Sequence, residues 1–167
     1  MSSPPLPLAP DFWSFSLDFY GRHGVAEACL ELQDRHGLDV NLVLYCCWRG
    51  DILTQAQLQA AIDLTVPWRA EIVQPLRALR RRLKPGFPPF PDTGALALRK
   101  RIADAELEAE RLQQQALDAL ARNEGPILPS SRQAATANLM LLAALCDVPE
   151  ARDILNMMVM HLPEGPR

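Results

Sequence analysis

Residues 39–50 restrict the possible folds of this chain most strongly, because they are apolar on every side if they form a helix. Their sequence is Asp-Val-Asn-Leu-Val-Leu-Tyr-Cys-Cys-Trp-Arg-Gly. A helix without a polar stripe must be buried among several neighbours. Asp39 can accept a hydrogen bond from a free backbone N–H at the N-terminus, and Gly50 can supply a left-handed residue at the C-terminus. We therefore predict a buried central helix, with a buried strand as the alternative.

Two shorter helices are predicted before this stretch. Asp11 is expected to cap a helix that ends near Tyr20, and this helix has an aromatic face at spacings of three and four residues: Phe12, Phe15 and Phe19. A second helix is expected over residues 25–36, closed by Gly37. Both helices therefore offer an apolar face to the central one.

Further helix signals follow the central stretch. Thr54 and Gln57 have the spacing of a capping box, in which each side chain bonds the other residue's backbone N–H. Pro67 suits the first turn of a helix ending near Lys84, and Pro75 should kink or split that helix. Its inner face is expected at Trp68, Ile72, Leu76, Leu79 and Leu83. The proline-rich residues 85–93 predict a linker.

One long helix is predicted over residues 94–123. Its apolar residues alternate at spacings of four and three: Leu98, Ile102, Ala105, Ala109, Leu112, Ala116 and Leu120. Such a rhythm is typical of a coiled-coil-like seam, and the alanines would allow close packing. Ser130 with Gln133 has a second capping-box spacing and Pro149 suits a helix start, so two more helices are expected.

These elements predict an all-α fold. We expect a single helical bundle of about seven or eight helices around a buried central helix, with one long helix after a proline-rich linker. A mobile proline-rich leader is expected over residues 1–10, one helical domain over 11–162 and a tail over 163–167. The leader lacks the features of a secretory signal, and no apolar run approaches the roughly 20 residues that span a bilayer. A soluble cytoplasmic protein without membrane association is expected.

Patterns that identify common catalytic or metal sites are missing from the sequence. It contains no Gly-x-Gly-x-x-Gly, no phosphate loop, no His-Glu-x-x-His and no Gly-x-Ser-x-Gly. Its four cysteines, Cys29, Cys46, Cys47 and Cys146, are expected to be reduced core residues. We therefore expect no catalytic residue, no metal and no cofactor, and favour a non-enzymatic protein over an enzyme.

The first candidate site is a polar and aromatic set near the N-terminus: Trp13, Tyr20, Arg22, Gln33, Asp34, Asp39, Asn41 and Trp48. In one interpretation, Asp39 and Asn41 satisfy free N–H groups where the central helix begins, and Arg22 pairs with Asp34 or Asp39 between helices. In the other, the aromatic side chains wall a small polar pocket for a ligand or for a partner's side chain.

A second candidate site lies in the middle of the chain. Residues 66–111 carry ten basic and six acidic side chains, although the net charge of the whole chain is -3. The candidate basic partner surface consists of Arg77, Arg80, Arg81, Arg82 and Lys84. These bases could neutralise neighbouring acidic helices or bind an acidic protein surface. Nucleic acid is the least favoured partner, because no known reading motif accompanies the basic residues.

Three motifs are similar to a known family. They are Phe-Trp-x-Phe-Ser-Leu over residues 12–17, Tyr-Gly-Arg-x-Gly-Val over 20–25, and Cys-Leu-x-Leu-Gln-Asp-x-x-Gly-x-Asp-Val-Asn-Leu over 29–42. They resemble a family of short proteobacterial proteins that is catalogued as a domain of unknown function. The resemblance implies a bacterial, cytoplasmic, helical protein and brings no catalytic residue or cofactor.

The favoured hypothesis is therefore a protein–protein interaction or adaptor module. Its partner would be another protein, or a second copy bound through the long helix. The alternative is a helical small-molecule or lipid-binding protein, or an enzyme, that uses a polar pocket near Asp34, Asp39 and Asn41. Weak nucleic-acid binding through the basic residues is the third hypothesis.

Overall fold

The computed structural model describes residues 9–164, and over this range it contains helices and their connections but no strand. The α-helices are α1 (Phe12–Tyr20), α2 (Val25–His36), α3 (Val40–Trp48), α4 (Gln55–Trp68), α5 (Gln74–Arg82), α6 (Asp92–Glu124), α7 (Arg132–Leu145) and α8 (Arg152–Val159). A π-helical segment η1 (Arg69–Val73) joins α4 to α5, and a 3₁₀ turn η2 (Pro149–Ala151) precedes α8. The predicted all-α class is confirmed. The expected leader and tail fall mostly outside the described residues.

Contacts divide the described residues into two compact units. The first unit comprises residues 9–62 and 114–164, and the second comprises residues 63–113, so the boundary falls within α4 and within α6. Buried apolar side chains are concentrated in the first unit. In the second unit, all of which is described, only Val73, Ala95 and Ala109 are buried and apolar. The second unit therefore has almost no hydrophobic core of its own.

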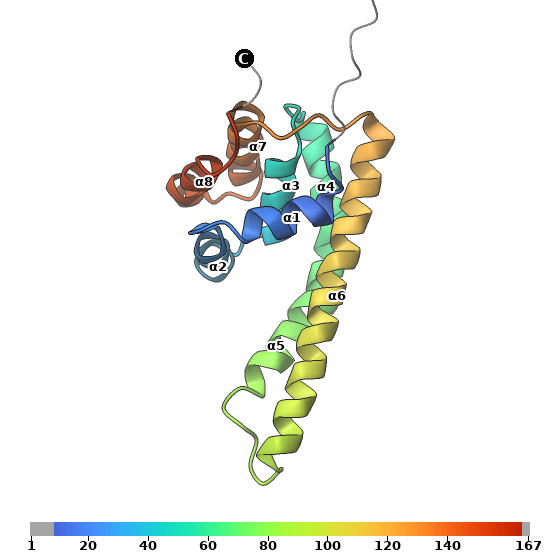
Figure 1. Ribbon diagram of the computed structural model, residues 1–167, viewed down its shortest axis with the longest axis vertical. Coiled ribbons are helices and arrows are strands. Elements are labelled where there is room, and N and C mark those ends of the chain that lie inside the picture. Colours follow the sequence, from blue (N-terminus) through green and yellow to red (C-terminus); the bar gives the residue numbers. More distant parts are fainter. Residues whose placement is uncertain (1–8, 165–167) are drawn as a thin grey trace, which may run out of the picture. The chain divides into compact units, whose positions relative to one another are not determined.

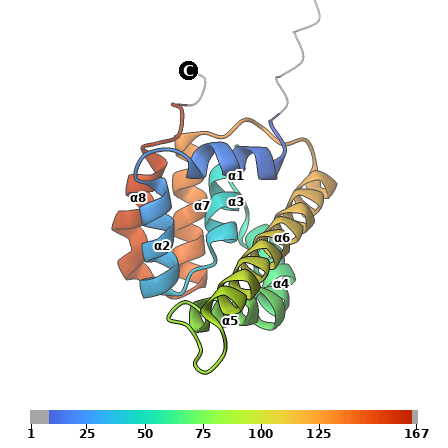
Figure 2. The same ribbon diagram turned by 60° about the horizontal axis from the view of Figure 1, so that its bottom comes forward.

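Helix α3 is the centre of the first unit. It packs against α1, α2 and α7, and every side chain from Asn41 to Trp48 is buried. Figure 2 shows α8, α2, α7 and α3 running side by side, with α1 lying across their ends. The predicted buried central helix is confirmed, and the strand alternative is excluded. The helix is enclosed by its neighbours because it is apolar on every side.

The start of α3 follows the prediction, whereas its end does not. An Asp39 carboxylate oxygen accepts the backbone N–H of Asn41 at 2.9 Å. The expectation of a left-handed Gly50 is wrong, because Arg49, the residue after α3, is extended and Gly50 has no positive φ. A Cβ on Gly50 would lie 2.5 Å from the carbonyl oxygen of Leu128 and still closer to that of Pro129. Glycine is needed here because another backbone segment passes directly against it.

Other predicted helix starts are confirmed or shifted by one residue. Asp11 caps α1 by accepting the Ser14 backbone N–H at 2.9 Å. The capping box before α4 is present, with the Thr54 N–H donating to Gln57 Oε1 at 2.9 Å and the Gln57 N–H donating to Thr54 Oγ1 at 3.2 Å. The capping box predicted before α7 is wrong, because Ser131 and not Ser130 caps this helix. Two adjacent serines made the choice ambiguous.

The second unit is an antiparallel helical hairpin in which α5 lies beside α6 (Figure 1). The prediction that Pro67 begins a helix is wrong, because Pro67 lies inside α4. An interruption is present near Pro75, as predicted. This proline has no N–H to offer to the carbonyl of Glu71, and the wider turn of η1 lies directly before it.

The two predicted apolar faces lie only partly on the contact line of the hairpin. On α6 the buried residues of the hairpin are Ala95, Glu106, Ala109 and Gln113. Of the predicted seam, Ala109 is therefore buried and Ile102 and Leu120 are half-buried, whereas Leu98, Ala105, Leu112 and Ala116 are exposed. Of the inner face predicted for residues 67–84, Ile72 and Leu79 are exposed, whereas Trp68, Leu76 and Leu83 are half-buried.

The contact line holds small side chains such as Ala109, whose carbonyl accepts the indole N–H of Trp68 at 2.9 Å. It also holds ion pairs of Arg77 and Arg80 with Glu106. Leu79 on α5, and Leu98 and Leu112 on α6, are therefore turned away from this line, towards solvent.

Candidate functional site

Asp39 and Asn41, which were predicted at the centre of a polar site, both form hydrogen bonds inside the first unit. Asp39 caps α3 as described, and it is half-buried. The side-chain oxygen of Asn41 accepts a hydrogen bond from Gln114 Nε2 at 2.8 Å, and both residues are buried. Asn41 therefore joins α3 to the C-terminal part of α6. A buried amide on an apolar helix requires such a partner.

The aromatic members of the predicted site differ in environment. Trp48 is fully buried, its ring stacks on Phe12 with centroids 5.1 Å apart, and its indole N–H donates to the Pro10 carbonyl at 2.9 Å. Trp13 is half-buried and Tyr20 is exposed. Trp48 is therefore a core residue that fixes the chain just before α1.

The remaining members lie nearer the surface. Arg22 donates to an Asp18 carboxylate oxygen at 2.8 Å and to the carbonyl of His161. Gln33 is half-buried and Asp34 is exposed. The eight predicted residues thus range from completely buried to exposed, and they do not share one environment.

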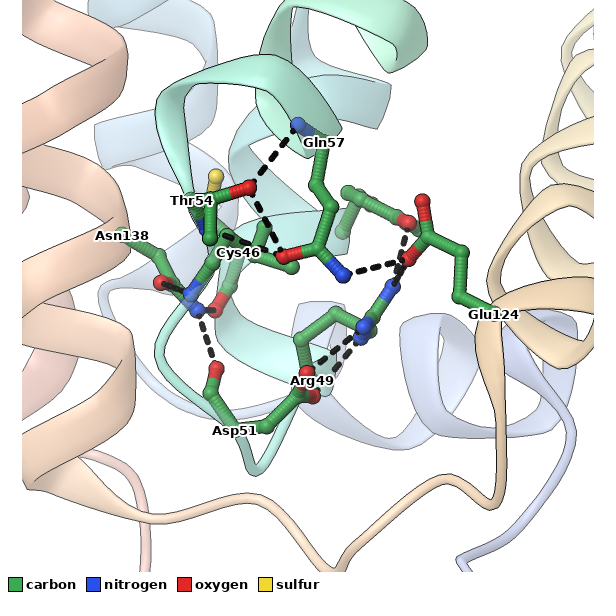
Figure 3. Close-up of polar contacts among 9 residues, drawn as sticks. Cys46, Arg49, Asp51, Thr54, Gln57, Glu124 and Asn138 are labelled. Atoms are coloured by element: carbon green, nitrogen blue, oxygen red, sulfur yellow. Dashed lines mark hydrogen bonds and ion pairs between the residues drawn. The ribbon is translucent and has the colours of Figure 1, made fainter.

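A buried cation that the sequence hypotheses did not include lies at the end of α3 (Figure 3). Arg49 is only 3% exposed. Its Nε and Nη2 donate to the two carboxylate oxygens of Asp51 at 2.8 and 2.6 Å, and its Nη1 donates to Glu124 at 2.9 Å and to the Tyr45 hydroxyl at 2.8 Å. The hydrogen bonds from Arg49 hold the pKa of Asp51 below its usual value. Burial raises the pKa of Tyr45 to about 12, which keeps its hydroxyl protonated.

Asn138 and Gln57 extend this network to two further helices (Figure 3). Asn138 is fully buried, accepts the Leu53 backbone N–H at 2.8 Å and donates to the Asp51 carbonyl at 3.0 Å. Gln57 Nε2 donates to Glu124 at 3.2 Å. The network ties the end of α3 to α4, α6 and α7. A charge placed directly after an apolar helix was the sequence signal that could have revealed it, since a buried charge needs partners.

All four cysteines are free thiols, and three of them are fully enclosed. Burial raises the pKa of the Cys29 thiol to about 12, and it raises the pKa values of Cys46 and Cys47 as well. The thiolate is the nucleophilic form of cysteine. At neutral pH these three residues are therefore protonated and shielded, which is a poor state for nucleophilic catalysis.

This burial predicts how the thiols react with 5,5′-dithiobis(2-nitrobenzoic acid). In the native chain Cys29, Cys46 and Cys47 should react only after the protein opens, whereas half-buried Cys146 can react earlier. After unfolding in guanidinium, all four thiols should react in a single fast phase. The absorbance of the released thionitrobenzoate measures both phases. Rapid reaction of two or more thiols in the native protein would contradict the burial of α2 and α3.

The candidate basic partner surface is divided by its contacts. Arg77 donates to Glu106 at 2.9 Å and to Glu110 at 2.6 Å, and Arg80 also bonds Glu106. Burial works to raise the pKa of Glu106, but the hydrogen bonds from Arg80 and Arg77 outweigh it, and the pKa is lowered. Both arginines are therefore engaged within the hairpin.

The other three basic residues of this set are exposed: Arg81, Arg82 and Lys84. The guanidinium of Arg82 lies over the ring of Phe87, 4.3 Å from its centroid. The exposed cations are thus grouped at the end of α5, beside the connection to α6.

One side of the hairpin carries exposed apolar side chains. On a helical wheel of α6, with 100° per residue, Leu98, Ala105 and Leu112 lie within about 40° of one another. In an antiparallel pair of helices, positions turned the same way from the contact line lie on the same side. On η1 and α5, Ile72 and Leu79 lie on the same side of the contact line as Leu98, Ala105 and Leu112. The ion pair Arg77–Glu110 lies on the other side. We name as the apolar face Ile72, Leu79, Leu98, Ala105 and Leu112.

Two further properties concern residues 9–164. Within this range no group of three or more His, Cys, Asp or Glu side chains could hold a metal ion. No helix there has both the length and the hydropathy needed to cross a bilayer.

A family model described as "Protein of unknown function (DUF2390)" matches residues 11–117. The match covers more than half of the chain, and it contains α1 to α5 and the whole of the hairpin. The chain matches no curated protein and no solved structure.

Proposed function

The chain belongs to the DUF2390 family, and we propose that it is a protein–protein interaction module and not an enzyme. Its binding surface in this proposal is the apolar face of the hairpin. The supporting observation is that Leu98 and Leu112 are 50% and 44% exposed on a hairpin with three buried apolar side chains. Two helices with so little core gain stability when another surface covers their apolar side.

Contacts of the polar groups favour this proposal over a ligand-binding pocket or an enzyme. The side-chain oxygen of Asn41 is bonded to Gln114, and an oxygen of Asp39 is bonded to the start of α3. These groups already serve the fold. A small-molecule or lipid site near Asp34, Asp39 and Asn41 is therefore the less favoured alternative.

Nucleic-acid binding through the basic residues is the least favoured alternative. Arg77 and Arg80 are paired with Glu106 and Glu110. These carboxylates reduce the positive field that a phosphate backbone would meet. The proposal also places the protein in the cytoplasm, where its free thiols would stay reduced.

Photo-crosslinking in cells tests the proposal. The photoreactive residue p-benzoylphenylalanine is introduced in place of Leu98 or Leu112 of the full chain. Irradiation should produce a discrete protein adduct of higher mass from both positions, because both side chains would be enclosed by a partner. Gel electrophoresis and mass spectrometry identify the adduct.

The same helix provides matched control positions. Leu96 and Leu107 are 56% and 54% exposed, and they lie roughly 160–180° around α6 from the centre of the apolar face at Ala105. Photoreactive residues there should give no such adduct. Equal adducts from both pairs of positions, or none from Leu98 and Leu112, would remove the apolar face as the binding surface.

A further inference from the structure

We propose that the occupant of the apolar face is a second copy of this chain, with the two α6 helices antiparallel and crossing at Ala105. The inference rests on the proposed function, because it names the partner of the same surface. Three features of the hairpin lead to it: the direction of its apolar stripes, the apolar area left exposed, and the symmetry of the residues around Ala105.

The direction of the stripes points to two more helices. In a four-helix bundle, each helix directs its apolar stripe at the bundle axis, between its two neighbours. In the hairpin, neither apolar stripe points straight at the neighbouring helix. Leu98 and Leu112 on α6 and Leu79 on α5 all point to the same side of the line that joins the two helix axes. A second hairpin placed on that side would complete a bundle and enclose both stripes.

The exposed area is close to what a stable dimer needs. If a fully exposed large apolar side chain offers roughly 180 Å², the exposed fractions of Ile72, Leu79, Leu98 and Leu112 leave about 330 Å² of apolar surface in solvent. A stable interface buries about 800 Å² on each partner, of which roughly 450 Å² is apolar. Ala105 and the aliphatic parts of neighbouring charged side chains can add the remainder.

The sequence around Ala105 is complementary to itself when reversed. Leu98 and Leu112 lie seven residues before and after Ala105. In an antiparallel pair centred there, Leu98 meets the partner's Leu112, and the small Ala105 side chains allow the helices to approach closely. Arg101 then lies near the partner's Glu108, giving opposite charges at the rim. Within its own helix Glu108 is 3.9 Å from Arg111, a distance at which the attraction is weak at an exposed site.

Sedimentation equilibrium of the full chain tests this dimer. The wild-type chain should sediment as a dimer, and the double variant Leu98→Glu/Leu112→Glu should weaken association at least about 100-fold, because four carboxylates would enter the interface. The control variant Leu96→Glu/Leu107→Glu adds the same charge at slightly more exposed positions on the opposite side of α6, and it should remain a dimer. Circular dichroism and thermal melts confirm that the variants are folded.

Charge reversal tests the antiparallel arrangement. Arg101→Glu and Glu108→Arg should each weaken the dimer several-fold, because each variant places like charges opposite one another. The combined variant should restore association to near the wild-type level. If the losses of association free energy in the two single variants simply add up in the combined variant, the proposed crossing at Ala105 is wrong.

Two results would overturn the dimer itself. One is a wild-type chain that sediments as a monomer at all accessible concentrations. The other is a dimer that Leu98→Glu/Leu112→Glu leaves intact. If photo-crosslinking at Leu98 and Leu112 then yields an adduct with a different protein, the interaction function stands and only the identity of the partner is wrong.

Discussion

Replacing Gly50 with alanine is expected to lower the free energy of unfolding by about 3 kcal/mol. The added Cβ would lie 2.5 Å from the Leu128 carbonyl oxygen and closer to that of Pro129. Both atoms belong to the backbone, so a side-chain rotation cannot relieve the overlap, and the connection before α7 has to move. Urea denaturation followed by circular dichroism measures the change.

A second glycine provides the control. Gly94 lies within α6, and a Cβ added to it meets nothing within 4 Å. Gly94→Ala should therefore raise the stability by up to about 1 kcal/mol, because alanine loses less backbone entropy in a helix. If Gly50→Ala is as stable as Gly94→Ala, the close passage of Leu128 and Pro129 over the end of α3 is not present in solution.

Replacing Arg49 with methionine should lower the free energy of unfolding by about 3–5 kcal/mol at pH 7. This is the typical range for removing one partner of a buried ion pair. Methionine has a similar length but leaves Asp51, Glu124 and the Tyr45 hydroxyl without their shared cation. Arg35→Met is the matched control. Arg35 forms an exposed pair with Glu31 one turn away, and its loss should cost no more than about 0.5 kcal/mol.

The effect of Arg49→Met should also depend on pH. The pKa of Asp51 is lowered in the folded protein, so its pairing stabilises the fold above the unfolded-state pKa of about 3.9. This contribution is lost as the pH falls through the lower, folded-state pKa. The stability difference between wild type and variant should therefore narrow below about pH 4, as measured by urea denaturation at several pH values. A difference that is constant from pH 7 to pH 3 would contradict the ion pair.

Most of the first unit could be predicted because its residues act locally or through a simple burial rule. Asp39 follows the ordinary capping preference, and the capping box of Thr54 and Gln57 depends only on spacing. The all-apolar stretch after Asp39 requires burial whatever surrounds it. These signals need no knowledge of distant contacts.

The missed features depend on contacts between distant segments. Gly50 looks like a helix terminator, and only its position against Leu128 and Pro129 shows why glycine is there. Arg49 and Asn138 are 89 residues apart in the chain and join one network. No local pattern connects them.

The two helices of the hairpin were predicted, but their packing against each other was not. The apolar rhythm through Leu98 and Leu112 indicates correctly where α6 is apolar, but it does not say which neighbour covers that stripe. Within the chain, the line facing α5 is filled by Glu106 and its arginine partners. We interpret the stripe at Leu98 and Leu112, which α5 does not cover, as the surface that binds a second copy.

Hydrogen exchange of the full chain at two concentrations tests this central claim most directly. The backbone amides of residues 96–112 should exchange more slowly at high concentration than at low concentration, whereas amides of α3 should exchange at the same rate in both. Equal exchange of residues 96–112 at the two concentrations, or a slowing confined to helices of the first unit, would contradict the proposed interface.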